Sequence, residues 1–232
     1  MKLLFTCLFF LLFLAGIAQK FEFENEKTHQ SPVNITDSKC QIGKHSLTMT
    51  YDISSEHLTH EFQSVEVDYD AGSYVTFDGL NYNLLQFHFH TPSEHLVNDL
   101  RYPMEMHIVH QTEDQQYFLV IALLFEAGEE DPFIAQFLND VPLGKKHIDN
   151  DQKFLDINQE LIPEVFLSYY HYEGSLTTPP YSENVDWIID TRVHTCSRSQ
   201  LERLVILEGD NHREKQKIYD RIVEKVISDD YL

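Results

Sequence analysis

The chain has little positive charge and, beyond its N-terminus, no long apolar run. Its 232 residues contain 17 lysines and arginines against 38 aspartates and glutamates, so the formal net charge is −21. Proteins that bind nucleic acid or anionic membranes need basic patches, so this balance argues against both kinds of partner. The sequence also lacks internal repeats, low-complexity tracts and interdomain linkers. With 42% hydrophobic and 24% charged residues, it is typical of one globular domain.

The single long apolar run lies at the N-terminus and has the layout of a secretory signal peptide. Met1-Lys2 is a short basic start, residues 3–14 are apolar apart from Thr6, and Gly16-Ile17-Ala18 supplies the small residues of a cleavage site. The run is shorter than the roughly 20 residues that cross a bilayer, so we expect cleavage rather than an uncleaved anchor. The sequence predicts a signal peptide at residues 1–18, a mature domain at residues 19–232 starting at Gln19, and a secreted or otherwise exported protein without a membrane span.

Cysteine is scarce in the mature chain. Cleavage would remove Cys7 and leave only Cys40 and Cys196. In an oxidising compartment these two could form one disulfide, or they could stay as two free thiols. Both alternatives remain open from the sequence.

Most of the secondary structure is expected to be strand. Short alternating or apolar runs are separated by turn residues such as Asp78-Gly79. They predict strands at residues 46–51, 64–68, 74–77, 84–90, 105–110, 117–125, 166–172 and 185–190. Helices are predicted at 132–138, which begins with Pro132, and at 197–207.

The tail between Arg213 and Ile227 has apolar residues at helical spacing, among them Ile218, Ile222 and Val226. We expect a C-terminal helix that docks on its own domain. The alternative is a helix that binds a protein partner.

Three histidines give the strongest chemical signal. His88 and His90 stand two residues apart, and side chains on a strand alternate between its faces, so both share one face. The 17-residue step to His107 leaves room for a second strand beside the first. Three imidazoles would then converge and leave a fourth position open, as in a catalytic zinc site.

The residues that precede these histidines strengthen the prediction. A metal-bound imidazole usually donates its second N–H to a fixed acceptor, which sets the tautomer. Gln86 lies two residues before His88, and Glu105 lies two residues before His107, each on the ligand's own face. Because the chain has 13 histidines, a His-x-His pair alone would be weak. The two neighbouring acceptors make chance packing a poor explanation.

Six blocks of the sequence resemble, in order, those of α-class carbonic anhydrases, between about residues 30 and 200. They are Gln30-Ser31-Pro32-Val33-Asn34-Ile35, Gln86-Phe87-His88-Phe89-His90, Ser93-Glu94-His95, Glu105-Met106-His107-Ile108-Val109-His110, Gly174-Ser175-Leu176-Thr177-Thr178-Pro179-Pro180 and Trp187. The resemblance implies a mainly β (α+β) fold: a single domain with a large twisted, mostly antiparallel central sheet and peripheral helices. It also implies reversible hydration of carbon dioxide to bicarbonate and a proton, by attack of hydroxide bound to a Zn²⁺ cofactor.

The same resemblance implies roles for individual residues. His88, His90 and His107 would be the zinc ligands, and Thr177 would accept a hydrogen bond from the hydroxide and donate one to Glu94. His60 would relay the product proton at the mouth of the cleft. Carbon dioxide has no net charge and needs an apolar pocket. The residues around the substrate and product would be Val109, Val120, Leu176, Thr178, Val185 and Trp187.

Two other functions are kept as alternatives. The stretch before Gln30 is short and the tail departs from the family's pattern, so the chain could be a non-catalytic binding or assembly subunit. It could also be a zinc hydrolase that acts on esters. The enzyme is favoured because the three histidines, Thr177 and Glu94 are all present.

Overall fold

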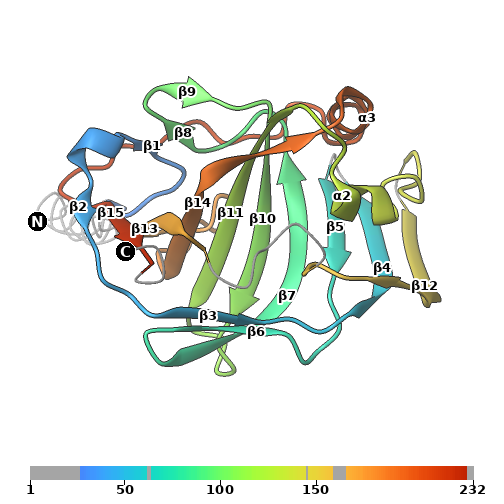
Figure 1. Cartoon of the computed structure of the whole chain (residues 1–232), viewed down its shortest axis with the longest axis horizontal. Helices are drawn as coiled ribbons and strands as arrows, with labels where there is room; N and C mark the ends of the chain where they lie inside the picture. The colour runs from blue at the N-terminus through green and yellow to red at the C-terminus, as the bar shows by residue number, and fades with distance from the viewer. Residues whose placement is uncertain (1–26, 62–63, 145, 159–165, 229–232) are drawn as a thin grey trace, which may run out of the picture.

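The computed structural model describes residues 27–61, 64–144, 146–158 and 166–228, so the predicted signal peptide and Cys7 lie outside the described part. Within it, a 12-stranded sheet has the order β12-β4-β5-β7-β10-β11-β14-β13-β15-β2, and β3 pairs with β6, which joins β7 (Figure 1). The strands are β2 (Gln41–Ile42), β3 (Leu47–Thr50), β4 (Ser54–Glu61), β5 (Ser64–Asp68), β6 (Tyr74–Phe77), β7 (Leu80–His90), β10 (Met104–Gln111), β11 (Phe118–Ala127), β12 (Lys146–Leu155), β13 (Ser168–Gly174), β14 (Val185–Cys196) and β15 (Glu224–Ile227). A small second sheet contains β1 (Asn34–Ile35), β8 (Leu96–Val97) and β9 (Leu100–Arg101).

Antiparallel pairs dominate the large sheet, and only β11–β14 and β15–β2 run parallel in its described part. The predicted fold class, a mainly β chain with a large mostly antiparallel sheet and few helices, is confirmed. Asp78 and Gly79 form the tight turn between β6 and β7, and both have positive φ (48° and 84°), as two-residue hairpin turns require. The central run that includes Leu119 and Leu124 is buried along its length because β11 lies between β10 and β14.

The alternation of side chains along the central strands builds one apolar cluster on each face of the sheet. Phe87 and Phe89 of β7 belong to the larger cluster. The short helix α2 (Pro132–Phe137) packs there, with the rings of Phe133 and Phe137 5.2 and 5.4 Å from that of Phe87. Helix α3 (Arg198–Glu208) begins with a capping box at Ser197 and covers the same face. Both predicted helices are confirmed, and the opposite face of β7 is left to the histidines.

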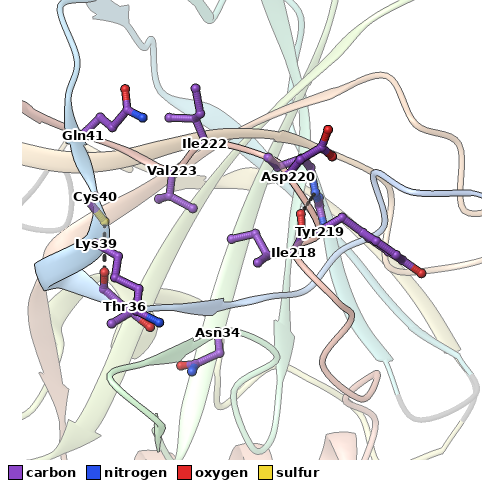
Figure 2. Close-up of a pocket in the computed structure, with 11 residues that line it drawn as sticks. Asn34, Thr36, Lys39, Cys40, Gln41, Ile218, Tyr219, Asp220, Ile222 and Val223 are labelled. Atoms are coloured by element: carbon purple, nitrogen blue, oxygen red, sulfur yellow. Dashed lines mark hydrogen bonds between the residues drawn. The ribbon is translucent and has the colours of Figure 1, made fainter.

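The predicted C-terminal helix is wrong. Residues 211–223 run as irregular chain, followed by strand β15, which pairs with β13 and with β2. These neighbours supply hydrogen bonds to the backbone. Val223 and Val226 are buried in different apolar clusters, which is possible because side chains along an extended segment alternate between its two sides. Figure 2 shows how residues 218–223 lie against residues 34–41 and line a shared pocket. A partner-binding helix is therefore excluded for this segment.

The two cysteines of the described part are not joined. Cys196 is buried at the end of β14, and Cys40 lies in the pocket of Figure 2, where its thiol donates to the Thr36 carbonyl oxygen at 3.5 Å. The free-thiol alternative is the one that the structure contains. Among the described residues, no helix is long and apolar enough to cross a membrane.

Candidate metal centre

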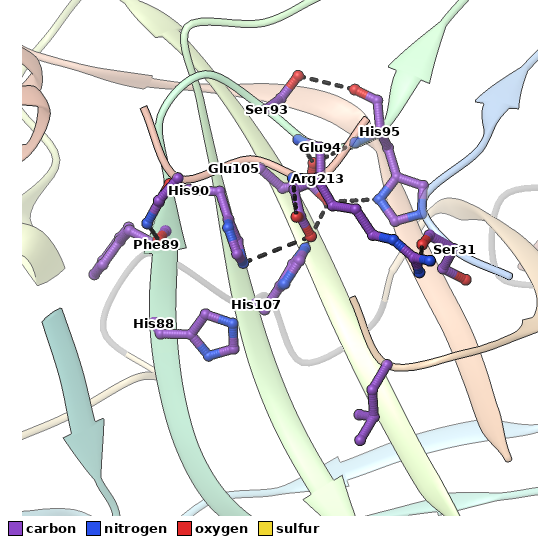
Figure 3. A network of polar contacts seen from close by, with 12 residues as sticks. Ser31, His88, Phe89, His90, Ser93, Glu94, His95, Glu105, His107 and Arg213 are labelled. Carbon is purple, nitrogen blue, oxygen red and sulfur yellow. Dashed lines mark hydrogen bonds and ion pairs between the residues drawn. The ribbon is translucent and has the colours of Figure 1, made fainter. Parts of the chain in front are cut away.

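The sheet register brings the three predicted ligands together. Strands β7 and β10 pair antiparallel with His107 directly opposite His88, and Glu105 opposite His90. One ring nitrogen from each histidine lies within 4.8 Å of the others. Figure 3 shows the three rings from these strands gathered at one point of the sheet face. His90 and His107 are buried and His88 is half-buried, so the cluster is open on one side.

Two of the rings are held by the acceptors that the sequence indicated. The Gln86 Oε1 atom lies 2.9 Å from His88 Nδ1, and the Glu105 Oε1 atom lies 2.8 Å from His107 Nε2. Neither acceptor oxygen carries a proton when Glu105 is ionised, so His88 Nδ1 and His107 Nε2 donate. The lone pairs of His88 Nε2 and His107 Nδ1 are then left for a metal ion.

His90 supports the same conclusion. It is buried, and neither of its ring nitrogens has a hydrogen-bond partner among the described residues. Burial lowers the pKa of His90, and burial together with the neighbouring imidazoles holds the pKa of His88 well below its usual value. Both rings are therefore neutral near pH 7, as metal ligands must be. Three imidazoles with one approach left open fit a zinc ion.

Glu105 is the centre of a fully buried polar network. Its Oε2 atom accepts from the backbone N–H groups of Glu94 and His95, both at 2.8 Å, and its Oε1 atom also contacts His95 Nδ1 at 2.7 Å. Burial alone would raise the pKa of Glu105, but the imidazoles of His95 and His107 and their hydrogen bonds hold that pKa well below its usual value. The carboxylate is thus ionised and can fix the tautomer of His107.

The network continues away from the centre. His95 Nε2 lies 2.7 Å from the hydroxyl of Tyr172, which donates to Ser31 Oγ at 2.8 Å. Gly174 allows this close packing, because a Cβ there would lie 2.2 Å from Ser31 Oγ. No sequence pattern predicts that His95, Tyr172 and Ser31 meet, because the two contacts join residues that are 77 and 141 positions apart.

Glu94 lies beside the histidines but has a free oxygen. Its Oε1 atom accepts from the Arg213 backbone N–H at 2.7 Å, whereas Oε2, 3.6 Å from His90 Nε2, has no hydrogen-bond partner among the described residues. The expected hydrogen bond from Thr177 to this oxygen is therefore not formed in the structure. Thr177 is buried in the segment after β13, and Thr178 next to it is exposed.

The predicted apolar wall forms one cluster on the histidine face. Val109, Val120, Val185 and Trp187 belong to the smaller core cluster, and Leu176 packs against it half-buried. The register explains the grouping, because Val109 is opposite Val120 and Val120 is opposite Trp187. The Trp187 ring lies 4.9 Å from that of His107, and its Nε1–H donates to the Ser175 carbonyl oxygen at 3.0 Å. An apolar surface therefore borders the histidines.

His60 does not join this site, and its placement at the cleft mouth is corrected. On β4, Thr59 is opposite Glu66, which is opposite His88, so the next residue, His60, faces the other side of the sheet. There His60 is buried, with Nδ1 2.8 Å from the Pro142 carbonyl oxygen and Nε2 3.2 Å from that of Leu207. Both nitrogens are occupied by backbone carbonyls, so the ring is a structural link to the end of α3.

Comparison with known proteins places the chain in a family. A model of the eukaryotic-type carbonic anhydrases matches residues 18–226. A carbonic anhydrase of Neisseria gonorrhoeae is 33% identical over 211 residues, which cover 90% of this chain and 81% of that protein. The α-carbonic anhydrase of Thermovibrio ammonificans, solved in complex with the inhibitor sulfanilamide, superposes with a TM-score of 0.79 at 32% identity, covering 85% of this chain and 87% of that one. Dioscorin complexed with ascorbate superposes with a TM-score of 0.75 at 28% identity, covering 86% of each chain.

The chain belongs to the eukaryotic-type carbonic anhydrase family. The prediction of a carbonic anhydrase enzyme is confirmed by relatives that carry this name over most of the chain. The non-catalytic alternative is not favoured by these relatives.

Proposed function

We propose that the protein catalyses the reversible hydration of carbon dioxide to bicarbonate and a proton, with a zinc ion held by His88, His90 and His107. The observation that carries this proposal is the convergence of three imidazole nitrogens within 4.8 Å, with fixed acceptors behind His88 and His107. A zinc ion bound there would act as a Lewis acid and make hydroxide available near neutral pH.

Around that centre, Gln86 and Glu105 act by orienting the rings. The four hydrogen bonds on Glu105 fix its carboxylate in place. It therefore keeps a proton on His107 Nε2 and leaves Nδ1 as the ligand atom. Gln86 keeps the proton of His88 on Nδ1 and leaves Nε2 as the ligand atom, and the Gln86 amide N–H donates a 3.1 Å hydrogen bond to Glu66. These contacts support a preorganised site, since neither acceptor can rotate without losing a partner.

Glu94 and Thr177 would orient the nucleophile. The buried Oε2 atom of Glu94 has no hydrogen-bond partner among the described residues, so it is available to accept a hydrogen bond from the Thr177 hydroxyl. The threonine oxygen would then offer only a lone pair to the nucleophile, which must donate its proton to it and so directs its own lone pair at the substrate. A ligand that cannot donate a hydrogen bond would be disfavoured.

The apolar cluster would hold carbon dioxide. The substrate has no charge or dipole, and Val109, Val120, Leu176, Val185 and Trp187 offer a surface that cannot hydrogen-bond to water, apart from the tied indole N–H. Thr178, exposed at the edge, would border the leaving bicarbonate. We also propose that the protein acts outside the cytoplasm, because of the signal-like residues 1–18.

Stopped-flow measurement of carbon dioxide hydration on the zinc-loaded protein tests the proposal. We expect fast turnover in the wild type, and in His107→Ala the loss of both turnover and the zinc ion of this site. Ester turnover is measured on the same sample, because a dedicated esterase would hydrolyse esters and leave carbon dioxide unchanged. A folded protein that retains zinc and shows no hydration would refute the catalytic proposal.

A further inference from the structure

A second group of metal-ligating side chains lies on the other face of the sheet. His45 precedes β3, His171 is on β13, and Glu224 begins β15. One ligand atom from each lies within 4.8 Å of the others. Tyr170 and Tyr172 belong to the cluster on the face of the zinc histidines, so His171 between them points to the opposite side. The group is therefore separate from the catalytic site.

The two imidazoles meet at one carboxylate oxygen. His45 Nε2 lies 2.9 Å from Glu224 Oε2, and His171 Nδ1 lies 3.4 Å from the same atom. The two rings are in edge contact, with centroids 4.6 Å apart. Two histidine nitrogens and one carboxylate oxygen form a donor set that zinc accepts in proteins, with room for a further ligand.

Each ring also has a second acceptor behind it. His45 Nδ1 lies 2.6 Å from Asp78 Oδ2, and His171 Nε2 lies 3.0 Å from Asp186 Oδ1. This is the carboxylate–histidine arrangement that sets the tautomer of a metal ligand. With the outer nitrogens donating to Asp78 and Asp186, the lone pairs of His45 Nε2 and His171 Nδ1 both point toward Glu224.

The charge of the group also favours a cation. Three carboxylates surround two imidazoles, so neutral rings would leave a local charge of −3, and each inner lone pair would face the oxygen of Glu224. A divalent ion between these atoms would offset the negative charge and would accept the lone pairs that otherwise face the Glu224 oxygen. Without a metal ion, a proton can lie between His45 Nε2 and Glu224 Oε2, which are 2.9 Å apart, so metal and protons would compete for these atoms.

The fold holds the three ligands in place. His171 and Glu224 are opposite each other in the β13–β15 pair. Gly43 lets the segment that leads to His45 pass close to β15, because a Cβ at Gly43 would lie only 2.8 Å from the Cβ of Glu224. Asp78 also holds Ser46, the residue after His45, because its carboxylate accepts a 2.8 Å hydrogen bond from the Ser46 N–H. The side chains of His45 and Glu224 are 18% and 31% exposed, so an ion can reach the site from solvent.

We propose that His45, His171 and Glu224 form a second binding site for a divalent transition-metal ion, with zinc as the first candidate. The site ties the segment before β3 to β13 and to the C-terminal strand β15. Its ligands come from parts of the chain up to 179 residues apart, so an ion there would crosslink both ends of the described domain. It would stabilise the folded chain by mass action, because the unfolded chain does not bring the three ligands together.

Equilibrium dialysis of the full chain against Zn²⁺, with the metal counted by atomic emission, tests the proposal. We expect two zinc ions per chain in the wild type and one in each of His171→Gln and Glu224→Gln. His57→Gln is the matched control and should keep two. His57 also lies between two carboxylates, Asp70 and Asp149, at 3.2 and 2.8 Å, but it belongs to none of the three-ligand groups of the described residues.

His107→Ala separates this site from the proposed catalytic one. It should bind one zinc ion, and added zinc should raise its melting temperature; the added Glu224→Gln change should abolish that rise. Glu224→Gln keeps the size of a partly exposed side chain, so it tests the site even if His171→Gln does not fold. The proposal is overturned if the two site variants bind as much zinc as the wild type, or if zinc does not shift the melting temperature of His107→Ala.

Discussion

Replacing Glu105 with glutamine should change which nitrogen of His107 carries the proton. The amide nitrogen cannot take the place of Oε2, because it would face the two backbone N–H groups of Glu94 and His95. It must replace Oε1, where it donates to the rings of His95 and His107. His107 Nε2 then has to accept, so its proton moves to Nδ1, the nitrogen that faces the other ligands.

The effect on metal binding can be estimated from this geometry. Loss of an acceptor behind a metal-bound histidine typically lowers metal affinity by about 10–100-fold. In Glu105→Gln the ligand nitrogen must also lose its proton before it can bind, so we expect about 100-fold, or roughly 2.7 kcal/mol. Gln86→Ala is the comparison, with an expected loss of about 10-fold, because His88 is half-buried and water can replace the lost acceptor.

Competition with a chromophoric chelator measures the zinc affinity of each variant without using activity. Circular dichroism and thermal melting must show that Glu105→Gln is folded, because the residue is completely buried. A folded Glu105→Gln protein that binds zinc within about twofold of the wild type would show that Glu105 does not set the tautomer.

Four shorter predictions follow from the same structure. His60→Ala should lower the free energy of unfolding by about 1–3 kcal/mol in denaturant melts, because it removes the contacts to two backbone carbonyl oxygens. Its turnover in weak buffer should be unchanged and should not respond to added imidazole. Slower turnover that imidazole restores would return His60 to the role of proton relay. Burial raises the pKa of Glu208 from 4.5 to about 8. Between these pH values the folded chain keeps a proton that the unfolded chain has lost, so the free energy of unfolding should fall by a few kcal/mol as the pH rises from 4.5 to 8. Chemical denaturation at several pH values should show a weaker pH dependence for Glu208→Gln, and the same pH dependence in both proteins would contradict this. Val109→Phe should lower carbon dioxide hydration while zinc content stays at the wild-type level; equal hydration would remove Val109 from the substrate surface. Mass spectrometry of the exported protein should find Gln19 at its N-terminus, and an intact Met1 would exclude cleavage.

The convergence of the three proposed zinc ligands could be predicted from the sequence because the information is local. Alternation on one strand places His88 and His90 together, and the antiparallel partner places His107 opposite His88. The same alternation places the acceptors Gln86 and Glu105, each two residues before a ligand, on the face of the histidines. These positions need only the strand direction and the register, both of which the apolar pattern around them specifies.

Other parts could not be predicted because their signal is not local. Strand β4 contains a single buried apolar residue, Leu58, and β12 is polar and largely exposed at the edge of the sheet. Both form because neighbouring strands supply hydrogen bonds to the backbone. The apolar spacing of the tail indicates a helix, but the same spacing also fits burial of alternate residues on two sides of a strand. His45, His171 and Glu224 meet only through the tertiary fold.

His60 shows that a short motif can misassign a residue when the strand around it is not recognised. Thr59, Glu66 and His88 are paired across neighbouring strands and share one face of the sheet, so the alternation of side chains places His60 on the opposite face. A further criterion is which acceptor faces each ring nitrogen. Both nitrogens of His60 face backbone carbonyl oxygens, and those of His95 face the Glu105 carboxylate and the Tyr172 hydroxyl, so both rings are held by hydrogen bonds within the protein. His88 and His107 each keep one nitrogen free.

The same criterion separates the two metal groups by how strongly each should hold its ion. In the proposed zinc triad the Glu94 Oε2 atom lies 3.6 Å from His90 Nε2, beyond hydrogen-bond distance, so protons compete more weakly there, and burial of His88 and His90 disfavours the charged rings. Around Glu224 the two inner nitrogens lie 2.9 and 3.4 Å from a carboxylate oxygen, within hydrogen-bond distance, so a proton can take the place of the metal ion. We therefore expect the second site to bind zinc more weakly than the triad at neutral pH, and a dialysis titration should resolve two successive steps. If both ions bind with equal affinity, proton competition is not what sets the strength of the second site.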